Sequence, residues 1–280
     1  MRVGIQVSIR DRIDLAADRA RGLGCETAQI FSCNPRSWAA RPLDPEAVAR
    51  LRQKLYEFDI HPLVVHVTYL PNLATPDPVL RRRSVRRVIG EVRRADQLAA
   101  DYFVLHLGHH MGSGIDAALG NIRAAVDEVL RAAAPRLTLL LENTAGDTGS
   151  VGDRFEHIAQ IIAGVADARR VGICFDTAHA FAAGYDLRTP RAVDATVTEL
   201  DRRIGLGRLH VVHANDAMFE LGSHRDRHQH IGKGHIGRPG LRAVVNHPCL
   251  RQLPFILETP FHNEGEDAAN VRALKRFRGG

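Results

Sequence analysis

Residues 137–176 read LTLLLENTAGDTGSVGDRFEHIAQIIAGVADARRVGICFD, an apolar run, an amphipathic run and a second apolar run. The runs at 137–143 and 171–176 are short and apolar, which is typical of strands buried on both faces. Between them, 153–169 repeats apolar residues at steps of three and four, the pattern of a helix with one apolar face. Two buried strands joined by a helix predict a parallel pair.

The same alternation runs along the whole chain. Strands are expected at 2–8, 27–32, 62–67, 102–108, 137–143, 171–176, 209–216 and 254–260. Helices are expected at 11–23, 44–58, 78–99, 115–134, 153–169, 189–204, 238–250 and 265–277. Eight such units close a parallel barrel, whereas an open doubly wound sheet usually has a Gly-rich first turn, which this chain lacks. We therefore predict an α/β fold, a single (β/α)8 TIM barrel over residues 1–280, with its active site at the carboxyl ends of the strands.

The composition is that of an ordinary soluble protein, with 45% hydrophobic and 25% charged residues. No run approaches the roughly 18 apolar residues that span a bilayer, and the amino terminus lacks the apolar core of a signal peptide. The four cysteines have no metal-binding or disulfide spacing, so we expect a cytoplasmic protein with free thiols and no membrane partner. The net charge of +6 is compatible with an anionic partner, although the arginine excess also fits a coding bias.

Six consecutive predicted strands end on an acid or a histidine. These residues are His66, His106, Glu142, Asp176, His213 and Glu258, with His179 three positions after Asp176. The connection after the seventh strand adds Asp226 and His228, which are two residues apart and project to one side of an extended segment. One histidine at a strand end is usually an ordinary polar residue. The coincidence of all these groups at one barrel mouth carries the inference.

Four acids and five histidines at one mouth repel one another or stay unsatisfied unless cations lie between them. Imidazole and carboxylate donors together suit zinc, and manganese or iron is also compatible. Nine groups exceed what one ion takes, so the residues predict two or three metal ions. Spacing alone would pair Asp176 with His179.

Several longer motifs contain these residues. They are FSCNPRSW (31–38), HVTYLPNLA (66–74), HLG (106–108), LENTAG (141–146), FDTAHAFAAGYD (175–186), HANDA (213–217), DRHQHIGKGHIG (226–237) and LETP (257–260). In this order and spacing the chain resembles the endonuclease IV family of abasic-site endonucleases (family 2). The resemblance covers essentially the whole chain, and its family fold is the same eight-stranded barrel.

The resemblance implies three zinc ions per chain, with Mn²⁺ compatible with some of the sites. The implied ligands are His66, His106 and Glu142 for the first ion; Glu142, Asp176, His213 and Glu258 for the second; and His179, Asp226 and His228 for the third. Glu142 would bridge two ions and is the expected catalytic residue.

The implied activity is DNA repair by base excision, namely hydrolysis of the phosphodiester 5′ to an abasic site in duplex DNA, which leaves a 3′-OH. A multi-metal centre suits this chemistry because cations neutralise charge on the attacked phosphate. The family also inserts side chains into the bent duplex, and the matching positions here are Arg36, Tyr69 and Leu70. The partner is then damaged duplex DNA, and the family favours a monomer.

Two positions depart from the family pattern. Gln6 stands where many members have histidine, and Lys233 stands where an acid is frequent. The alternative function is a metal-dependent sugar isomerase of the xylose isomerase-like barrel group. Such an enzyme usually holds two metals, and it has no use for the Asp226–His228 pair or for side chains that insert into DNA. A non-catalytic barrel that binds damaged DNA is the third hypothesis.

Overall fold

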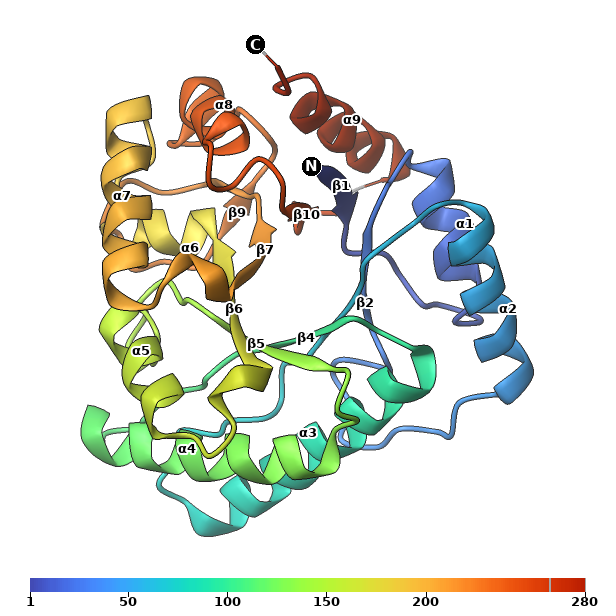
Figure 1. Ribbon diagram of the computed structural model, residues 1–280, viewed down its shortest axis with the longest axis vertical. Helices are drawn as coiled ribbons and strands as arrows, with labels where there is room; N and C mark the ends of the chain where they lie inside the picture. Colours follow the sequence, from blue (N-terminus) through green and yellow to red (C-terminus); the bar gives the residue numbers. More distant parts are fainter. Residues whose placement is uncertain (262, 280) are drawn as a thin grey trace.

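The computed structural model describes residues 1–261 and 263–279, and its centre is a ring of parallel strands. The strands are β1 (Arg2–Ile5), β2 (Ala28–Phe31), β3 (Leu63–His66), β4 (Tyr102–Leu105), β5 (Thr138–Glu142), β6 (Val171–Asp176), β7 (Leu209–His213) and β10 (Pro254–Leu257). They follow the order β1-β10-β7-β6-β5-β4-β3-β2. The last strand thus pairs with the first, as an α/β barrel requires (Figure 1).

The barrel closes between β1 and β2 through a short contact. A single parallel bridge joins Gln6 to Gln29, and the Val7 amide donates to the Gln29 carbonyl at 2.8 Å. The predicted α/β barrel is confirmed, and its seam lies at these two glutamines.

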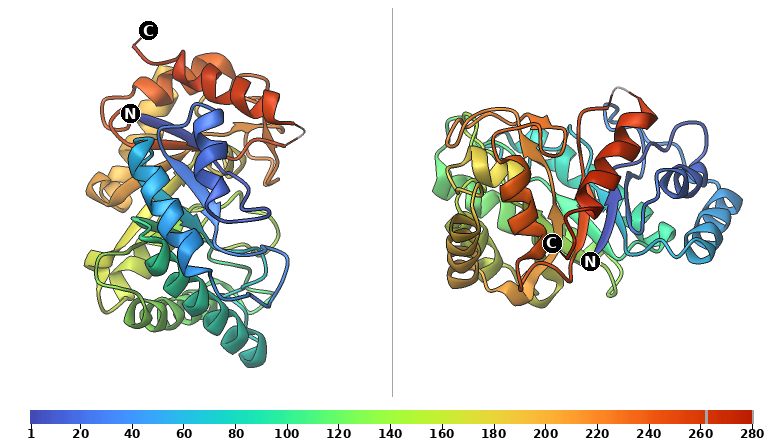
Figure 2. Two further views of the ribbon diagram at one scale, coloured as in Figure 1. Left: turned by 90° about the vertical axis from the view of Figure 1, so that its right-hand side faces the viewer. Right: turned by 90° about the horizontal axis from the view of Figure 1, so that it is seen from above.

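Helices surround the strands on all sides (Figures 1 and 2). They are α1 (Leu15–Gly22), α2 (Pro45–Glu57), α3 (Pro78–Leu98), α4 (Ile115–Ala132), α5 (Phe155–Gly164), α6 (Thr177–Ala182), α7 (Pro190–Arg203), α8 (Gly237–Asn246) and α9 (Glu264–Lys275). Asp44 caps α2, as expected of an Asp before a first-turn proline, because its carboxylate accepts from the Glu46 amide at 3.1 Å. No helix within residues 1–261 and 263–279 has the length and hydropathy to cross a membrane.

Side chains alternate along the strands between two apolar layers. Outward residues such as Phe103, Leu141 and Phe175 pack against the helices in the main core. Inward residues form a second, smaller cluster inside the barrel, made of Val64, Val104, Leu140, Cys174, Val211 and Ile256. This inner cluster fills the barrel and forms the floor of its mouth.

Two elements at the mouth were not predicted. Directly after β6, the residues of α6 form a short buried helix. Beyond β7, the long connection folds into a two-stranded antiparallel ribbon of β8 (Asp216–Ala217) and β9 (His228–Gln229). Both elements carry candidate site residues.

Candidate metal centre

The candidate ligands at the strand ends share one register. Each lies two positions after a member of the inner apolar cluster, and two-residue spacing keeps side chains on the same face of a strand. The six pairs are Val64 and His66, Val104 and His106, Leu140 and Glu142, Cys174 and Asp176, Val211 and His213, and Ile256 and Glu258. The barrel therefore directs all six polar groups into its mouth, directly above the apolar floor.

Glu142 lies at the centre of the first group. Its side chain is fully buried, and its Oε2 is 3.1 Å from Nε2 of His66 and 3.1 Å from Nε2 of His106. The other ring nitrogen of His66, Nδ1, is 2.7 Å from the carbonyl oxygen of Val67. Since only a protonated Nδ1 can donate to this carbonyl, the lone pair of a neutral His66 is on Nε2 and faces the carboxylate.

The second group uses the other oxygen of Glu142. Nδ1 of His213 is 2.8 Å from Glu142 Oε1, 3.2 Å from Glu258 Oε2 and 3.9 Å from Asp176 Oδ2. Nε2 of His213 is 2.8 Å from Oε1 of Gln29, whose Nε2 donates to Glu258 Oε1 at 2.6 Å. Gln29 thus fixes the imidazole so that Nδ1 faces three carboxylates.

The third group lies beside α6 and the ribbon. Nε2 of His179 is 3.2 Å from Asp226 Oδ1 and 3.4 Å from Nε2 of His228, which is itself 3.6 Å from Asp226 Oδ1. The opposite nitrogens are both held by carbonyl oxygens, Nδ1 of His179 by Asn143 at 2.9 Å and Nδ1 of His228 by Glu258 at 2.9 Å. Two imidazole lone pairs and one carboxylate therefore point at a common centre.

This arrangement fits divalent cations. When the imidazoles are neutral, electron-donating atoms converge without a proton between them, as at the two Nε2 atoms of His179 and His228, and a cation relieves this repulsion. The donors form sets of three or four whose atoms lie within 4.8 Å of one another: His66, His106 and Glu142; Glu142, Asp176, His213 and Glu258; and Asp176, His179 and His228. Mixed nitrogen and oxygen donors in such numbers suit zinc.

Without a metal, protons on the histidines must balance the carboxylates. Burial alone raises the pKa of Glu142, but the charges of His106 and His213 outweigh burial and hold this pKa well below its usual range. Burial opposes a charged His179, but the carboxylates of Asp176 and Asp226 outweigh burial and raise its pKa well above the usual range. Metal ions and protons therefore compete for the same groups.

Asp176 combines a structural contact with its position in the centre. Its Oδ1 accepts from the His179 amide at 2.8 Å and caps α6, while its Oδ2 accepts from Asn215 at 2.7 Å. The Oδ2 atom also lies 3.8 Å from Nε2 of His228, so Asp176 borders both the second and the third group. Asp176 can thus cap α6 and act as a candidate metal ligand at the same time.

A buried aspartate fixes the connection that carries Asp226 and His228. Asp216 accepts from the amides of Gly234 at 3.0 Å and Ile236 at 3.0 Å. It joins the ribbon to the segment around Lys233, whose side chain is exposed. Such backbone anchoring holds an irregular connection over the mouth without a regular sheet.

The sequence interpretation missed several groups around the ligands. Gln29, Asn143 and Asn215 were overlooked because only acids and histidines were considered, although Gln29 has the inward register of a site residue. Cys174 also lies near Glu142 and His213. Burial raises the pKa of its thiol to about 12, which favours a neutral inner-layer side chain over a thiolate ligand. Oε1 of Gln6 is buried and accepts no hydrogen bond from the described residues.

The three predicted DNA-contacting residues lie on one side of the mouth. Tyr69 is 65% exposed and packs edge-on against Phe31, with ring centroids 5.2 Å apart. Its amide donates to the Pro35 carbonyl at 3.3 Å, which places it next to the exposed Arg36. Leu70 is half-buried beside it. An exposed aromatic ring and an arginine thus stand together at the rim.

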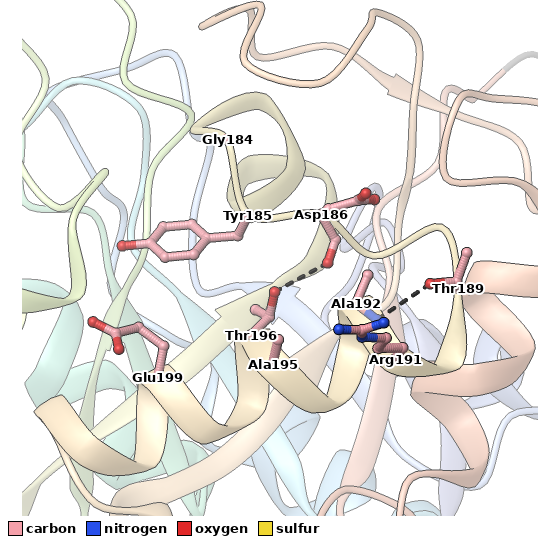
Figure 3. A pocket seen from close by; sticks show the side chains of 9 residues that line it. All are labelled: Gly184, Tyr185, Asp186, Thr189, Arg191, Ala192, Ala195, Thr196 and Glu199. Carbon is pink, nitrogen blue, oxygen red and sulfur yellow. Dashed lines mark hydrogen bonds between the residues drawn. The ribbon is translucent and has the colours of Figure 1, made fainter.

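A separate hollow lies between α7 and the segment before it, with a volume of about 460 Å³ (Figure 3). Its lining includes Tyr185, Arg191 and Glu199 and none of the nine candidate ligands. It is therefore distinct from the barrel mouth.

Comparison with known proteins places this chain in a family. The model of the xylose isomerase-like TIM barrel family matches residues 17–278. A probable endonuclease 4 from Methanoculleus marisnigri is 46% identical over 278 residues, which are 99% of each chain. The crystal structure of endonuclease IV from Thermus thermophilus is similar with a TM-score of 0.88 and 35% identity, covering 99% of this chain and 98% of that one.

The chain belongs to the endonuclease IV family. This confirms the family resemblance inferred from the motifs. A more distant structure, D-psicose 3-epimerase from Clostridium cellulolyticum, has a TM-score of 0.70 at 14% identity, covers 99% of this chain and 98% of its own, and shares the fold alone. Membership of the endonuclease IV family thus rests on sequence identity along the full length, and the barrel by itself does not decide it.

Proposed function

We propose that the protein is a zinc-dependent DNA-repair endonuclease that hydrolyses the phosphodiester 5′ to abasic sites in duplex DNA and leaves a 3′-OH. The whole chain would act as one catalytic domain, as a monomer in the cytoplasm. The names of the relatives support an endonuclease, and the converging donor sets support a metal-dependent one. The single observation that carries the proposal is the position of Glu142, whose two oxygens face different donor groups.

Three ions would be held in this centre. The ligands are His66, His106 and Glu142 for the first; Glu142, Asp176, His213 and Glu258 for the second; and His179, Asp226 and His228 for the third. Zinc bound there would stabilise the negative charge of the attacked phosphodiester as a Lewis acid, and it would lower the pKa of water so that hydroxide is available for attack at neutral pH. Mn²⁺ in some of the sites would provide the same chemistry.

The protein's own residues orient the substrate and the ligands. Gln29 and the carbonyls of Val67, Asn143 and Glu258 hold the imidazoles, so that their lone pairs stay directed at the centre. Arg36, Tyr69 and Leu70 would hold the bent duplex at the rim, where an amphipathic wedge replaces the stacking lost at an abasic nucleotide. Because attack by water needs no covalent intermediate, no serine or cysteine nucleophile is required.

The isomerase alternative has weaker support. The sugar epimerases with this fold are 12–19% identical to the chain, against 39–46% for the endonuclease 4 relatives. The exposed Tyr69 beside Arg36 and the third donor group also have no role in a two-metal sugar site. We therefore retain the nuclease as the proposed function.

The test replaces Glu142 by glutamine in the zinc-loaded enzyme. A neutral amide bridges two cations poorly, so single-turnover cleavage of an abasic duplex should fall by ~10²-fold or more, with loss of metal and an unchanged circular dichroism spectrum. The matched control Glu128→Gln, an exposed position on α4, should cleave normally. Wild-type protein that consumes an aldose or ketose and leaves the abasic duplex intact would support the isomerase instead.

A further inference from the structure

A basic groove lies outside the barrel mouth, between the connection that precedes α2 and one face of α3. Figure 1 shows this connection, in blue, beside α3. The groove has a volume of about 640 Å³. It is lined by Trp38, Ala39, Ala40, Arg41, Pro42, Arg83, Arg86, Arg87, Gly90, Glu91 and Arg94. Five of these residues are arginines and one is an acid, so the groove is strongly positive.

Helical spacing produces the arginine stripe. The positions 83, 86, 87, 90 and 94 recur at steps of three and four, and such residues share one helix face. Gly90 interrupts the stripe, and a methyl group there would meet no atom within 4 Å. The helix backbone is thus open to the groove between the arginines.

Two of the arginines belong to the groove floor. Arg94 donates to the carbonyls of Ser32 at 3.0 Å and Arg41 at 2.7 Å. Arg87 is buried, donates to the Trp38 carbonyl at 3.2 Å and forms an ion pair with Glu91 at 2.6 Å. These two side chains fasten the connection to α3 and give the groove a fixed shape.

The other three arginines are available for a ligand. Arg41, Arg83 and Arg86 are exposed, and none forms an ion pair with any acid in the described part of the chain. Arg83 stacks over the Trp38 ring, with 4.1 Å from its guanidinium carbon to the ring centroid, so its donors are oriented while its charge stays uncompensated. Three unpaired guanidiniums around one groove are suited to phosphate oxygens.

Hydrogen bonds link the groove to the segment that carries Tyr69, one of the predicted DNA-contacting residues. Its floor acid Glu91 accepts from the Thr68 amide at 2.9 Å and from the Thr68 hydroxyl at 2.5 Å, and Thr68 immediately precedes Tyr69. On the other side, Trp38 follows Arg36 by two residues in the same connection. The groove therefore adjoins the two segments that carry Arg36 and Tyr69.

We propose that this groove binds the phosphodiester backbone of the duplex flank, away from the abasic nucleotide. Its open shape and unpaired guanidiniums recognise phosphates without reading bases. This inference rests on the proposed function for the identity of the substrate. It assigns Arg41, Arg83 and Arg86 to affinity for long DNA and gives them no part in the reaction at the metal centre.

The test compares the double variant Arg83→Gln/Arg86→Gln with a matched double variant, Arg251→Gln/Arg276→Gln. The control arginines are exposed, form no ion pair with the described residues and lie at the amino ends of the strands, opposite the mouth. Binding of zinc-loaded protein is measured over a range of salt concentrations with abasic and intact duplexes. Each duplex is made about 10 or about 30 base pairs long, that is, about one or three helical turns.

The groove variant should bind both 30-base-pair duplexes more weakly, with a salt slope lowered by about 2, because each lost phosphate contact lowers it by about 1. Its binding of the short duplexes and its single-turnover cleavage at saturating DNA should match the wild type, as should every value for the control. An unchanged slope, or equal weakening with the short duplexes, would overturn the inference. Cleavage of the short abasic duplex by wild-type protein tests the proposed function separately, and the intact duplex still tests the groove if cleavage is absent.

Discussion

Gln29 and His213 are joined by a 2.8 Å hydrogen bond between the amide oxygen and Nε2 of the imidazole. Since the oxygen can only accept, the proton of a neutral His213 is on Nε2 and its lone pair is on Nδ1, which faces Glu142 and Glu258. The same amide donates to Glu258. One neutral side chain thus sets the orientation of two candidate ligands.

Replacement of Gln29 by leucine should therefore weaken the second metal site without removing a ligand. Loss of such an orienting partner typically lowers metal affinity by ~10- to 100-fold, which titration with a zinc indicator would measure. The matched change Gln6→Leu lies opposite Gln29 across the barrel seam and removes an oxygen that has no hydrogen-bond partner among the described residues. Equal losses in the two variants would show that the effect is on the seam and not on His213.

Removal of the third donor group should leave a folded protein with two metal ions. Asp226 precedes a two-residue strand and His228 lies in it, so the Asp226→Ala/His228→Ala variant loses few core contacts. Elemental analysis should show one ion fewer than in the wild type, and single-turnover cleavage should fall by at least ~10²-fold. A full complement of metal with normal cleavage would mean that the pair is structural.

Metal binding should release protons and depend on pH. The raised pKa of His179 means that this imidazole carries a proton in the metal-free protein at neutral pH, and zinc must displace it. A zinc titration in dilute buffer with a pH indicator should therefore record about one proton or more per chain at pH 7. No proton release would contradict the charge balance described above.

The raised pKa of His179 also predicts how the stability of the metal-free, chelated protein depends on pH. The pKa of His179 in the folded protein lies above its unfolded value of 6.5. Its contribution to the stability of the folded state is therefore complete below about pH 6.5 and is lost as the pH rises through the raised pKa. Melting temperatures of chelated protein should fall over this range, whereas those of zinc-loaded protein should change less.

Arg36 and Tyr69 provide a test of lesion recognition. If their side chains fill the gap left by an abasic nucleotide, Arg36→Ala and Tyr69→Ala should weaken binding to abasic duplex more than to intact duplex. Fluorescence anisotropy at fixed salt on matched duplexes gives this ratio. An equal loss on both duplexes would assign these residues to ordinary backbone contacts.

A carboxylate far from the mouth should make stability sensitive to acid. Glu26 accepts from the Val3 amide at 2.9 Å and contacts Lys275 and Arg278. Burial opposes ionisation of Glu26, but the Arg278 hydrogen bond and the Val3 amide outweigh it and lower its pKa to about 2. Its contribution is therefore present above about pH 4.5 and is lost as the pH falls towards 2. Because water screens part of this side chain, Glu26→Gln should cost only about 1–2 kcal/mol at pH 7 and progressively less at lower pH, by urea unfolding.

The sequence predicted the barrel well because its signal is periodic. All eight strands and their covering helices are present, with ends shifted by a few residues; the expected strand 102–108, for example, ends at Leu105. Beyond Leu105 the chain turns at Gly108, whose φ is +93°. The pattern of apolar residues does not indicate where such a turn ends a strand. Helix 153–169 likewise ends at Gly164 and continues after a break as a 3₁₀ turn at Ala168–Arg170.

The sequence indicates candidate ligands where ligand chemistry and strand register coincide. His66 and Glu142 stand out as polar groups that follow apolar strands, whereas Gln29 is neutral and its importance depends on the partner across the barrel. The short helix α6 was missed because its small residues carry little amphipathic signal. The β8–β9 ribbon depends on Asp216, whose carboxylate accepts hydrogen bonds from the amides of Gly234 and Ile236. These residues are distant in sequence, so local patterns do not indicate the ribbon.

The pairing of β10 with both β7 and β1 determines when the centre can form during synthesis. All residues of the first donor group are present once residue 142 has emerged, and His66, His106 and Glu142 lie at the ends of consecutive paired strands. The second group needs Glu258, whose strand must insert between β7 and β1 before Gln29 can contact it. For much of its translation, a nascent chain would therefore contain the first donor group without the second. Only the insertion of β10, which brings Glu258, completes the set of candidate ligands.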